Sequence, residues 1–211
     1  MKKLLFGLLF LSTLGSLSSC KEASKIPAPD VTSVPLLVAT VSPDNTKNYF
    51  DRLRARASIN DLPALANPTR PVFEFSFDVP DQRDVKIKAV EVYKSFQRAR
   101  LGPRVLVGSY SSFPATVSLN SQDALAGLQQ LSGATPPVLT NVLGATAAVP
   151  NDLNNGDIIL FTFEYVLQDG SRVILTPLVN VKTSSGATVQ VASGNQINPP
   201  YAVQAVFFVR P

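Results

Sequence analysis

Four cationic side chains surround a predicted Gly-Pro turn, where they could bind an anion. Lys94, Arg98, Arg100 and Arg104 flank the turn at residues 101–103. Guanidinium groups donate charge-assisted hydrogen bonds to phosphate and carboxylate groups, and the aromatic rings that follow could stack on a sugar. The alternative is that the charges protect strand ends in solvent and the rings pack in the core. The candidate ligand contact predicted here comprises Arg98, Arg100, Arg104, Tyr110 and Phe113.

Two turns rich in oxygen ligands could hold calcium, which prefers carboxylate and carbonyl groups. In the second turn Gly156 occupies a ligand position of the usual calcium-loop order, and an Asn-Gly turn leading into a strand is the simpler explanation. A solvated turn also explains the first, so we predict no metal and no other cofactor. The side chains concerned are Asp78, Asp81 and Asp84 in the first turn and Asp152, Asn154, Asn155 and Asp157 in the second.

Three glutamates occupy outward strand positions: Glu74, Glu91 and Glu164. Glycoside hydrolysis uses two carboxylates that face each other in a cleft. Nothing in the spacing of these glutamates brings two of them together, so we assign no catalytic residue.

The composition excludes several classes of enzyme. The chain has no His and a single Cys, Cys20, which removes Ser-His-Asp and Cys-His catalysis and most zinc sites. It also has no Trp, so a carbohydrate-binding platform would have to use Tyr or Phe. We therefore expect a protein that is not an enzyme.

The first twenty residues have the layout of a lipoprotein signal peptide. A short basic segment precedes an apolar run, 4–14, that is too short to span a bilayer. The sequence LSSC at 17–20 resembles the lipobox of bacterial lipoproteins, which implies cleavage before Cys20 and acylation of that residue; the alternative is an ordinary signal peptide. We expect residues 1–19 to be removed and residues 20–33 to be a flexible tether between the lipid anchor and the domain.

The residues after Cys20 indicate the destination of the protein. In lipoproteins generally, an Asp at this position favours retention in the inner membrane, whereas this chain has Lys21 followed by Glu22. A Lys followed by acidic residues resembles the surface-export signal of Bacteroidota-type lipoproteins. The resemblance implies the outer membrane and leaves open whether the domain faces the cell surface or the periplasm.

The charge balance argues against a nucleic-acid partner. The chain has 19 Lys and Arg against 15 Asp and Glu, and two lysines belong to the signal peptide, so the processed chain carries 17 against 15, a net charge of +2. A surface that binds nucleic acid needs a larger basic excess. The expected partners are the membrane, through the lipid on Cys20, and a glycan or an envelope protein.

Alternating apolar residues predict β-strands from residue 72 onward. The alternation is clearest at 72–79 and at 157–167, where every second residue is apolar. In the strand predicted at 85–96, the alternation slips in phase at Ala89-Val90, which predicts a bulge there. Further strands are predicted at 34–41, 85–96, 104–110, 113–119 and 203–209, with a hairpin at 179–191.

The turn after the strand at 157–167 can be predicted from its register. A loop of three residues, 168–170, pairs Tyr165 with Val173 and keeps one face of the hairpin apolar, with Gly170 in the left-handed conformation.

Helical signals are few. One helix is predicted at 121–131, with Asn120 or Ser121 as its N-cap and Gly133 at its end. Residues 48–57 could form a short helix or an irregular strand.

Short strands, one helix and no βαβ pattern predict an all-β fold: an antiparallel, immunoglobulin-like β-sandwich with one short helix in an insertion between strands. We expect residues 34–211 to form a single domain, of which 34–70 is the least regular part. The segments VEVYKSF (90–96), FPATV (113–117), NGD (155–157) and LQDGSR (167–172) resemble Bacteroidota surface lipoproteins, including uncharacterised immunoglobulin-like ones and the SusE-type accessory lipoproteins of glycan-uptake systems. The resemblance implies a non-catalytic binding or accessory role. The alternative is structural, adhesive or scaffolding.

Overall fold

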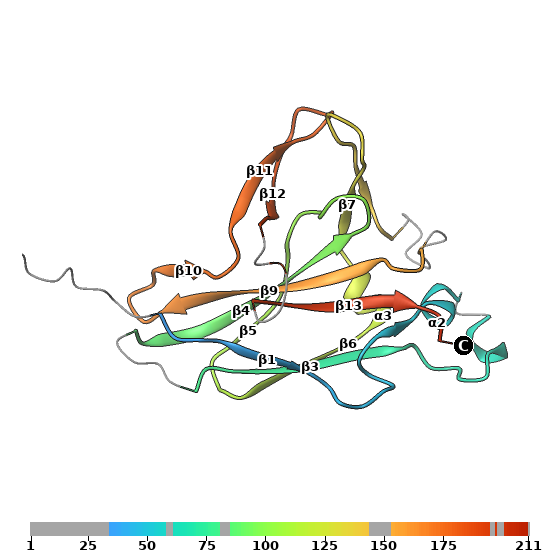
Figure 1. Cartoon of the computed structure of the whole chain (residues 1–211), viewed down its shortest axis with the longest axis horizontal. Helices are drawn as coiled ribbons and strands as arrows, with labels where there is room; N and C mark the ends of the chain where they lie inside the picture. Colours follow the sequence, from blue (N-terminus) through green and yellow to red (C-terminus); the bar gives the residue numbers. More distant parts are fainter. Residues whose placement is uncertain are drawn as a thin grey trace, which may run out of the picture. The chain divides into compact units, whose positions relative to one another are not determined.

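The fold has two larger β-sheets and two two-stranded hairpins (Figure 1). The computed structural model describes residues 34–57, 61–80, 85–143, 153–194, 197 and 201–210. The three-stranded sheet has the order β1-β3-β6 and is antiparallel throughout. Its strands are β1 (Val38–Val41), β3 (Val72–Asp78) and β6 (Ala115–Asn120). The predicted cleavage and lipidation at Cys20 and the predicted tether lie outside the described residues.

The second sheet has six strands and one parallel pair. Its order is β2-β13-β9-β4-β5, and β10 pairs with the C-terminal end of β9. The pairing of β2 with β13 is parallel, whereas the others are antiparallel. The strands are β2 (Phe50–Asp51), β4 (Ile87–Gln97), β5 (Val105–Tyr110), β9 (Ile158–Leu167), β10 (Arg172–Ile174) and β13 (Ala202–Phe208).

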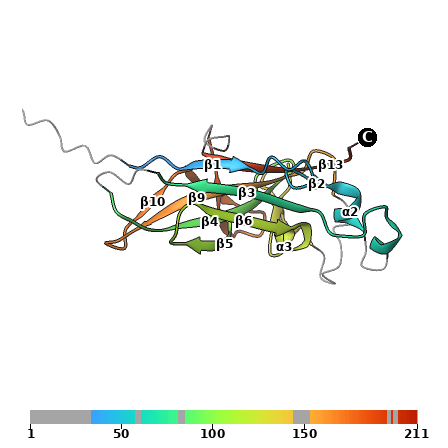
Figure 2. The ribbon, with the colours of Figure 1, turned by 90° about the horizontal axis from the view of Figure 1, so that it is seen from below.

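Phenylalanine rings from the two sheets meet in the core. Successive side chains of a strand point to opposite faces, so Phe73, Phe75 and Phe77 all point inward from β3, and each is 1% exposed. The ring of Phe161 on β9 lies 5.0 Å from that of Phe75, and the ring of Phe163 lies 5.5 Å from that of Phe77. These contacts make the two sheets a sandwich, whose layers are seen edge-on in Figure 1 and from the β3 side in Figure 2.

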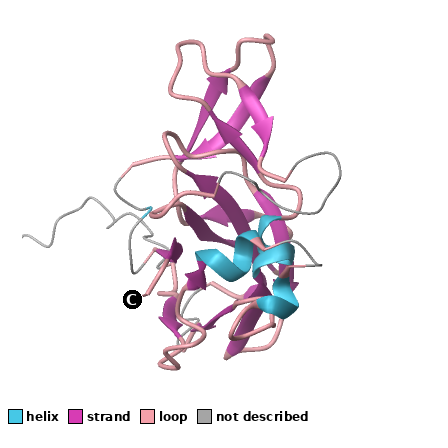
Figure 3. Cartoon of the chain, turned by 90° about the vertical axis from the view of Figure 1, so that its right-hand side faces the viewer, coloured by secondary structure: helices cyan, strands magenta, loops and turns pink. Residues whose placement is uncertain are grey.

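The outer face of β9 is also buried, which the alternating pattern did not predict. Leu160, Thr162 and Glu164 are at most 3% exposed. Two hairpins extend from this side of the sandwich (Figures 1 and 3), and the base of one, Leu178 and Ala192, packs with Leu160. The hairpins are β7 (Gln129–Leu131) with β8 (Leu139–Asn141), and β11 (Leu178–Lys182) with β12 (Thr188–Ala192).

The helix predicted at 121–131 is shorter than expected. The structure has α3 (Ser121–Leu125), and the Asn120 side chain caps it by accepting from the backbone N–H groups of Gln122 and Asp123. The helix ends at Ala126, because Gly127 adopts a positive φ of 72° and turns the chain into β7. Gly127 thus ends the helix, and the prediction that Gly133 does so is wrong.

Residues 48–57 combine both predicted alternatives. The short strand β2 leads directly into α2 (Arg52–Arg56), and Asp51 caps this helix through the N–H groups of Leu53 and Arg54. A single 3-10 turn, η1 (Leu62–Ala64), follows. The side chain of Phe50 on β2 stacks on Phe207 of β13 at 4.8 Å, which fixes this segment to the core.

The predicted turns and registers are largely confirmed. Tyr165 pairs with Val173, and Gly170 has a φ of 86°, as the three-residue loop requires. The register of β4 on β9 shifts between Ile87 and Ala89, next to the predicted bulge. The hairpin predicted at 179–191 is present as β11 and β12. The last strand is predicted to reach residue 209, but Val209 lies beyond the end of β13 and is 36% exposed.

The prediction of an all-β fold is confirmed. The immunoglobulin-like assignment stays a prediction, which the strand order supports: β1-β3-β6 stand where strands A, B and E stand in that fold, and β13-β9-β4-β5 where G, F, C and C′ stand. Within the described residues, no helix is long and apolar enough to cross a membrane.

Candidate functional site

Arg98, the first of the predicted ligand contacts, is held in a structural ion pair. Its Nε and Nη2 donate to the two carboxylate oxygens of Asp157, at 2.9 and 2.6 Å. Asp157 is 2% exposed and also accepts from the backbone N–H of Asn154 at 2.7 Å. The carboxylate that we considered for calcium therefore closes the turn before β9 and neutralises Arg98.

Arg100 and Arg104 point to different parts of the structure. Arg100 Nη2 donates to the Gly133 carbonyl at 3.3 Å and to the Thr135 hydroxyl at 3.2 Å, so this side chain lies against the loop of the β7–β8 hairpin. Arg104 turns onto the outer face of the six-stranded sheet, where its Nη2 donates to Glu164 at 3.2 Å.

Tyr110 and Phe113 pack against the core at the opposite end of β5. The Tyr110 ring lies edge-on to Phe77 at 5.4 Å, and the Phe113 ring lies 6.2 Å from Phe77. Burial raises the pKa of the Tyr110 hydroxyl. Tyr110 is six residues along the strand from Arg104, a separation of about 20 Å. The structure therefore does not bring the five predicted contact residues together on one surface.

Lys94 pairs with Val105, next to Arg104 in the chain, but its side chain lies on the opposite face of the sheet. It shares the inward face of β4 with Val92 and Phe96 and is 6% exposed. Its Nζ donates to the Asp123 carbonyl in α3 at 2.5 Å, and burial lowers its pKa. Lys94 thus joins α3 to the sheet.

A network of charged side chains occupies the outer face of β4, β9 and β10. Glu91 and Glu164 are direct cross-strand neighbours. Arg172 Nη1 donates to both carboxylates, at 2.7 Å to Glu91 and 2.9 Å to Glu164. Tyr93 donates its hydroxyl proton to Glu91 at 2.6 Å. With the bond from Arg104, each carboxylate has a cationic partner.

The two glutamates converge, but their electrostatics do not suit acid catalysis. The hydrogen bonds from Arg172 and Tyr93 lower the pKa of Glu91. A general acid at neutral pH requires the opposite shift, which burial without a cationic partner would provide. The bonds to both glutamates raise the pKa of Arg172, so the guanidinium stays charged. The network consists of ion pairs of Arg104 and Arg172 with the two glutamates.

A groove lies beside this network, between the sheet and the β11–β12 hairpin. It has a volume of about 370 Å³ and is lined by Tyr93, Pro103, Arg104, Val189 and Gln190. The lining combines an aromatic ring, two apolar side chains, a guanidinium group and an amide. It brings residues 93–104 next to residues that follow them by almost ninety positions in the sequence.

Arg104 links the groove to the charged network. Its guanidinium carbon lies 4.2 Å from the centre of the Tyr93 ring, a cation–π contact. Its Nη2 is bonded to Glu164, whereas its buried Nη1 has no hydrogen-bond partner among the described residues. A buried N–H without an acceptor is costly, so a group that supplied an acceptor here would stabilise the side chain.

Sequence reasoning identified Arg104 but missed the rest of the groove. Val189 and Gln190 belong to an ordinary hairpin, and no local signal shows that this hairpin folds back over the sheet. The charged network had a signal: the predicted register of Tyr165 with Val173 also places Glu164 and Arg172 on one face.

The two acidic turns considered for calcium are only partly described. Asp81, Asp84 and Asp152 lie outside the described residues. Asp78 accepts from its neighbour Val79 N–H at 2.7 Å, as expected for a turn. The described parts of the chain contain no cluster of three or more carboxylate, Cys or His ligands.

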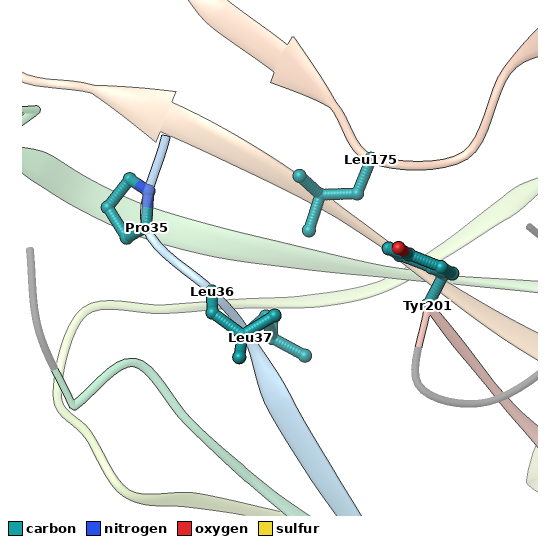
Figure 4. Close-up of a pocket in the computed structure, with 5 residues that line it drawn as sticks. All are labelled: Pro35, Leu36, Leu37, Leu175 and Tyr201. Carbon is teal, nitrogen blue, oxygen red and sulfur yellow. The ribbon is translucent and has the colours of Figure 1, made fainter. Parts of the chain in front are cut away.

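A second, smaller pocket is apolar and lies where the described chain begins. Its volume is about 60 Å³, and its lining is shown in Figure 4: Pro35, Leu36, Leu37, Leu175 and Tyr201. The Pro35 carbonyl accepts from the buried Tyr165 hydroxyl at 2.9 Å, which holds this segment against β9.

Comparison with known protein families, with curated proteins and with solved structures finds no match for this chain. The function is therefore inferred from the geometry of the site and the signals in the sequence.

Proposed function

We propose that this chain is a non-catalytic binding module, anchored in the outer membrane by lipid on Cys20, which binds its ligand in the groove beside Arg104. The observation that carries the proposal is the composition of the groove: Tyr93, Pro103 and Val189 offer apolar faces, and Arg104 and Gln190 offer hydrogen-bond donors. Binding sites for small ligands combine apolar walls with a few polar groups in this way.

The ion pairs beside the groove favour binding over catalysis. Glu91 and Glu164 are cross-strand neighbours on this face, and both are bonded to Arg172. A carboxylate that is held charged by an arginine is a poor proton donor and a weakened nucleophile. Their supported role is to fix Arg104 and Tyr93 in place, because Glu164 accepts from Arg104 and Glu91 accepts from Tyr93.

The donors define the class of ligand. Guanidinium and amide groups donate to carboxylates and hydroxyls, so an acidic or hydroxyl-rich glycan fits this lining. The groove is shallow and offers few contacts, so we expect a Kd between about micromolar and millimolar.

The test is a calorimetric titration of the protein with a set of neutral and acidic glycans. Gln190→Glu removes the amide donor and places a negative charge in the groove, so it should abolish binding of acidic glycans. Thr116→Glu adds the same side chain at an exposed position on β6 of the other sheet and should leave binding unchanged. Binding of acidic glycans that survives Gln190→Glu would place the ligand elsewhere, and absence of binding to every glycan would overturn the glycan proposal.

The anchor is tested separately. The Cys20→Ala protein should appear in the soluble fraction of lysed cells, whereas the parent protein should sediment with membranes, because acyl chains contribute about 0.8 kcal/mol for each buried methylene. Equal membrane association of the two proteins would refute the anchor.

A scaffolding role is the second candidate, and an apolar strip supports it. Val34, Leu36 and Val38 are 46, 61 and 43% exposed, at alternate positions along an edge strand and the segment before it. Exposed edges of this kind pair with other chains. If no glycan binds and the protein co-purifies with an envelope complex through this edge, scaffolding becomes the better explanation.

A further inference from the structure

We propose that the face around Val34, Leu36, Val38 and Tyr201 lies against the lipid surface to which the chain is anchored. This inference rests on the proposed lipid anchor. It adds a statement about orientation: one face of the domain contacts the bilayer and inserts apolar side chains into it.

The first argument is the pattern of exposure. From Val34 to Val38, side chains alternate between buried and exposed, and all three exposed ones are apolar. Leu36 is 61% exposed, the largest fraction among the exposed large apolar side chains of the described residues. The sequence from 34 to 41 carries no charged side chain. A face made for water carries charge at such positions, because exposed apolar edges promote aggregation.

The second argument is the adjoining pocket. Leu36 and Tyr201 line it together with Leu175, so the exposed side chains continue into a small apolar hollow (Figure 4). Tyr201 is 45% exposed. Tyrosine favours the boundary between hydrocarbon and water, because its ring is apolar and its hydroxyl is polar.

The third argument is the point of attachment. Residues 21–33 join Cys20 to Val34, and a chain of this length spans at most about 50 Å whatever its conformation. The anchor therefore keeps Val34, at one end of the apolar face, within about 50 Å of the bilayer. The Tyr165–Pro35 hydrogen bond fixes this attachment point to the core. Anchored proteins commonly combine acyl chains with a second membrane contact.

These arguments favour lipid over a second copy of the chain. A pairing between copies needs no particular relation to the attachment point, whereas a lipid contact requires the apolar face to lie beside it. Self-association is nevertheless an outcome that the experiment distinguishes.

The chain has no Trp, so a single introduced Trp is an unambiguous fluorescent probe. The Leu36→Trp protein is purified in its acylated form and reconstituted in vesicles of phosphatidylethanolamine and phosphatidylglycerol, with or without brominated acyl chains. Leu106→Trp is the matched control, because Leu106 on β5 is 51% exposed and lies on the other sheet. A third protein combines Leu36→Trp with Tyr201→Asp.

The expected result is a blue shift of Leu36→Trp emission on reconstitution and a loss of intensity in the brominated vesicles, with neither change for Leu106→Trp. Tyr201→Asp should reduce both changes. Vesicles that float with the protein but leave Leu36→Trp unquenched would overturn the proposal and leave the anchor intact. Protein that does not float with the vesicles would refute the anchor and this proposal together. A blue shift without vesicles, accompanied by a doubled mass in sedimentation, would show that a second copy covers the face and would also overturn the proposal.

Discussion

Glu91 and Glu164 face each other across β4 and β9, and one guanidinium group, that of Arg172, donates to both carboxylates. The two acids would repel each other without it, and Glu164 is only 3% exposed. Arg104 supplies the second cation. The outer face of the sheet therefore carries two anions and two cations, and Glu164 is the anion to which both cations bond.

The first prediction concerns this balance. Glu164→Gln should lower the free energy of unfolding by about 1–3 kcal/mol, because the amide leaves Arg104 and Arg172 without their shared anion. Glu74→Gln is the control: Glu74 pairs with Lys47 at the surface, with side chains 27 and 41% exposed, so its loss should cost under about 1 kcal/mol. Guanidinium denaturation measures both. Equal effects would show that the buried network contributes no more than a surface pair.

The second prediction concerns pH. Burial lowers the pKa of Lys94 below its ordinary value of 10.5. Between the folded and the unfolded pKa the unfolded chain binds more protons, so this residue makes the free energy of unfolding rise with pH in that window. Lys94→Met removes the effect and keeps the volume. The free energy of unfolding of the parent protein, relative to that of Lys94→Met, should therefore be lowest near neutral pH and rise as the pH approaches 10.5.

Buried tyrosines also titrate at high pH, so the quantity to measure is the difference in the free energy of unfolding between Lys94→Met and the parent protein. Burial raises the pKa of Tyr165 and of Tyr110 above 10, so both residues lower the stability as the pH rises beyond 10. This contribution is common to the parent protein and Lys94→Met and cancels between them. Urea denaturation at several pH values supplies the measurement. A difference that does not change with pH would mean that Lys94 titrates normally in the fold.

The third prediction concerns the core. Phe163 is fully buried and contacts Phe75 and Phe77 of the opposite sheet, with ring distances of 6.1 and 5.5 Å. Phe163→Ala should cost about 3–5 kcal/mol. Leu106→Ala, at a position 51% exposed, should cost under about 1 kcal/mol. An unchanged denaturation midpoint for Phe163→Ala would contradict the packing of the two sheets.

The fourth prediction concerns the turn that carries the arginines. A Cβ atom on Gly102 would collide with the backbone carbonyl of Gln129 in β7, which cannot rotate away. Gly102→Ala should therefore destabilise the protein by about 1–3 kcal/mol or more. At Gly133 the nearest atom to an added Cβ is the Ala99 Cβ at 3.9 Å, an ordinary contact, so Gly133→Ala should be nearly neutral. Thermal unfolding of both variants tests the close approach of this turn to β7.

Strands with one solvent-exposed face were predictable from the sequence. β3 shows period two because its outer face stays in contact with solvent, and the register of Tyr165 with Val173 follows from keeping one face apolar. β9 was only half predictable. Leu160, Thr162 and Glu164 look like the solvent side of a strand. The distant hairpin β11–β12 packs on Leu160, and the side chains of Arg104 and Arg172 bond to Glu164. Local pattern carries no information about such a covering segment.

The candidate site shows the same limit. Arg98, Arg100 and Arg104 are neighbours in sequence, but each found a different partner: Asp157, the β7–β8 loop and Glu164. These partners come from parts of the chain that only the tertiary fold brings near. The cluster of charges in the sequence therefore indicated side chains that have hydrogen-bonding partners, but it did not show whether those partners belong to a ligand or to the chain. The structure shows that they belong to the chain.

The position of β13 sets an order of events for vectorial synthesis. Residues 202–208 are made after every other described strand, yet β13 lies between β9 and β2. Until it arrives, β9 lacks a neighbour on one of its edges along half of its length, and Phe50 has no Phe207 to stack on. A chain exported as proposed would thus cross the inner membrane before its sheet could close.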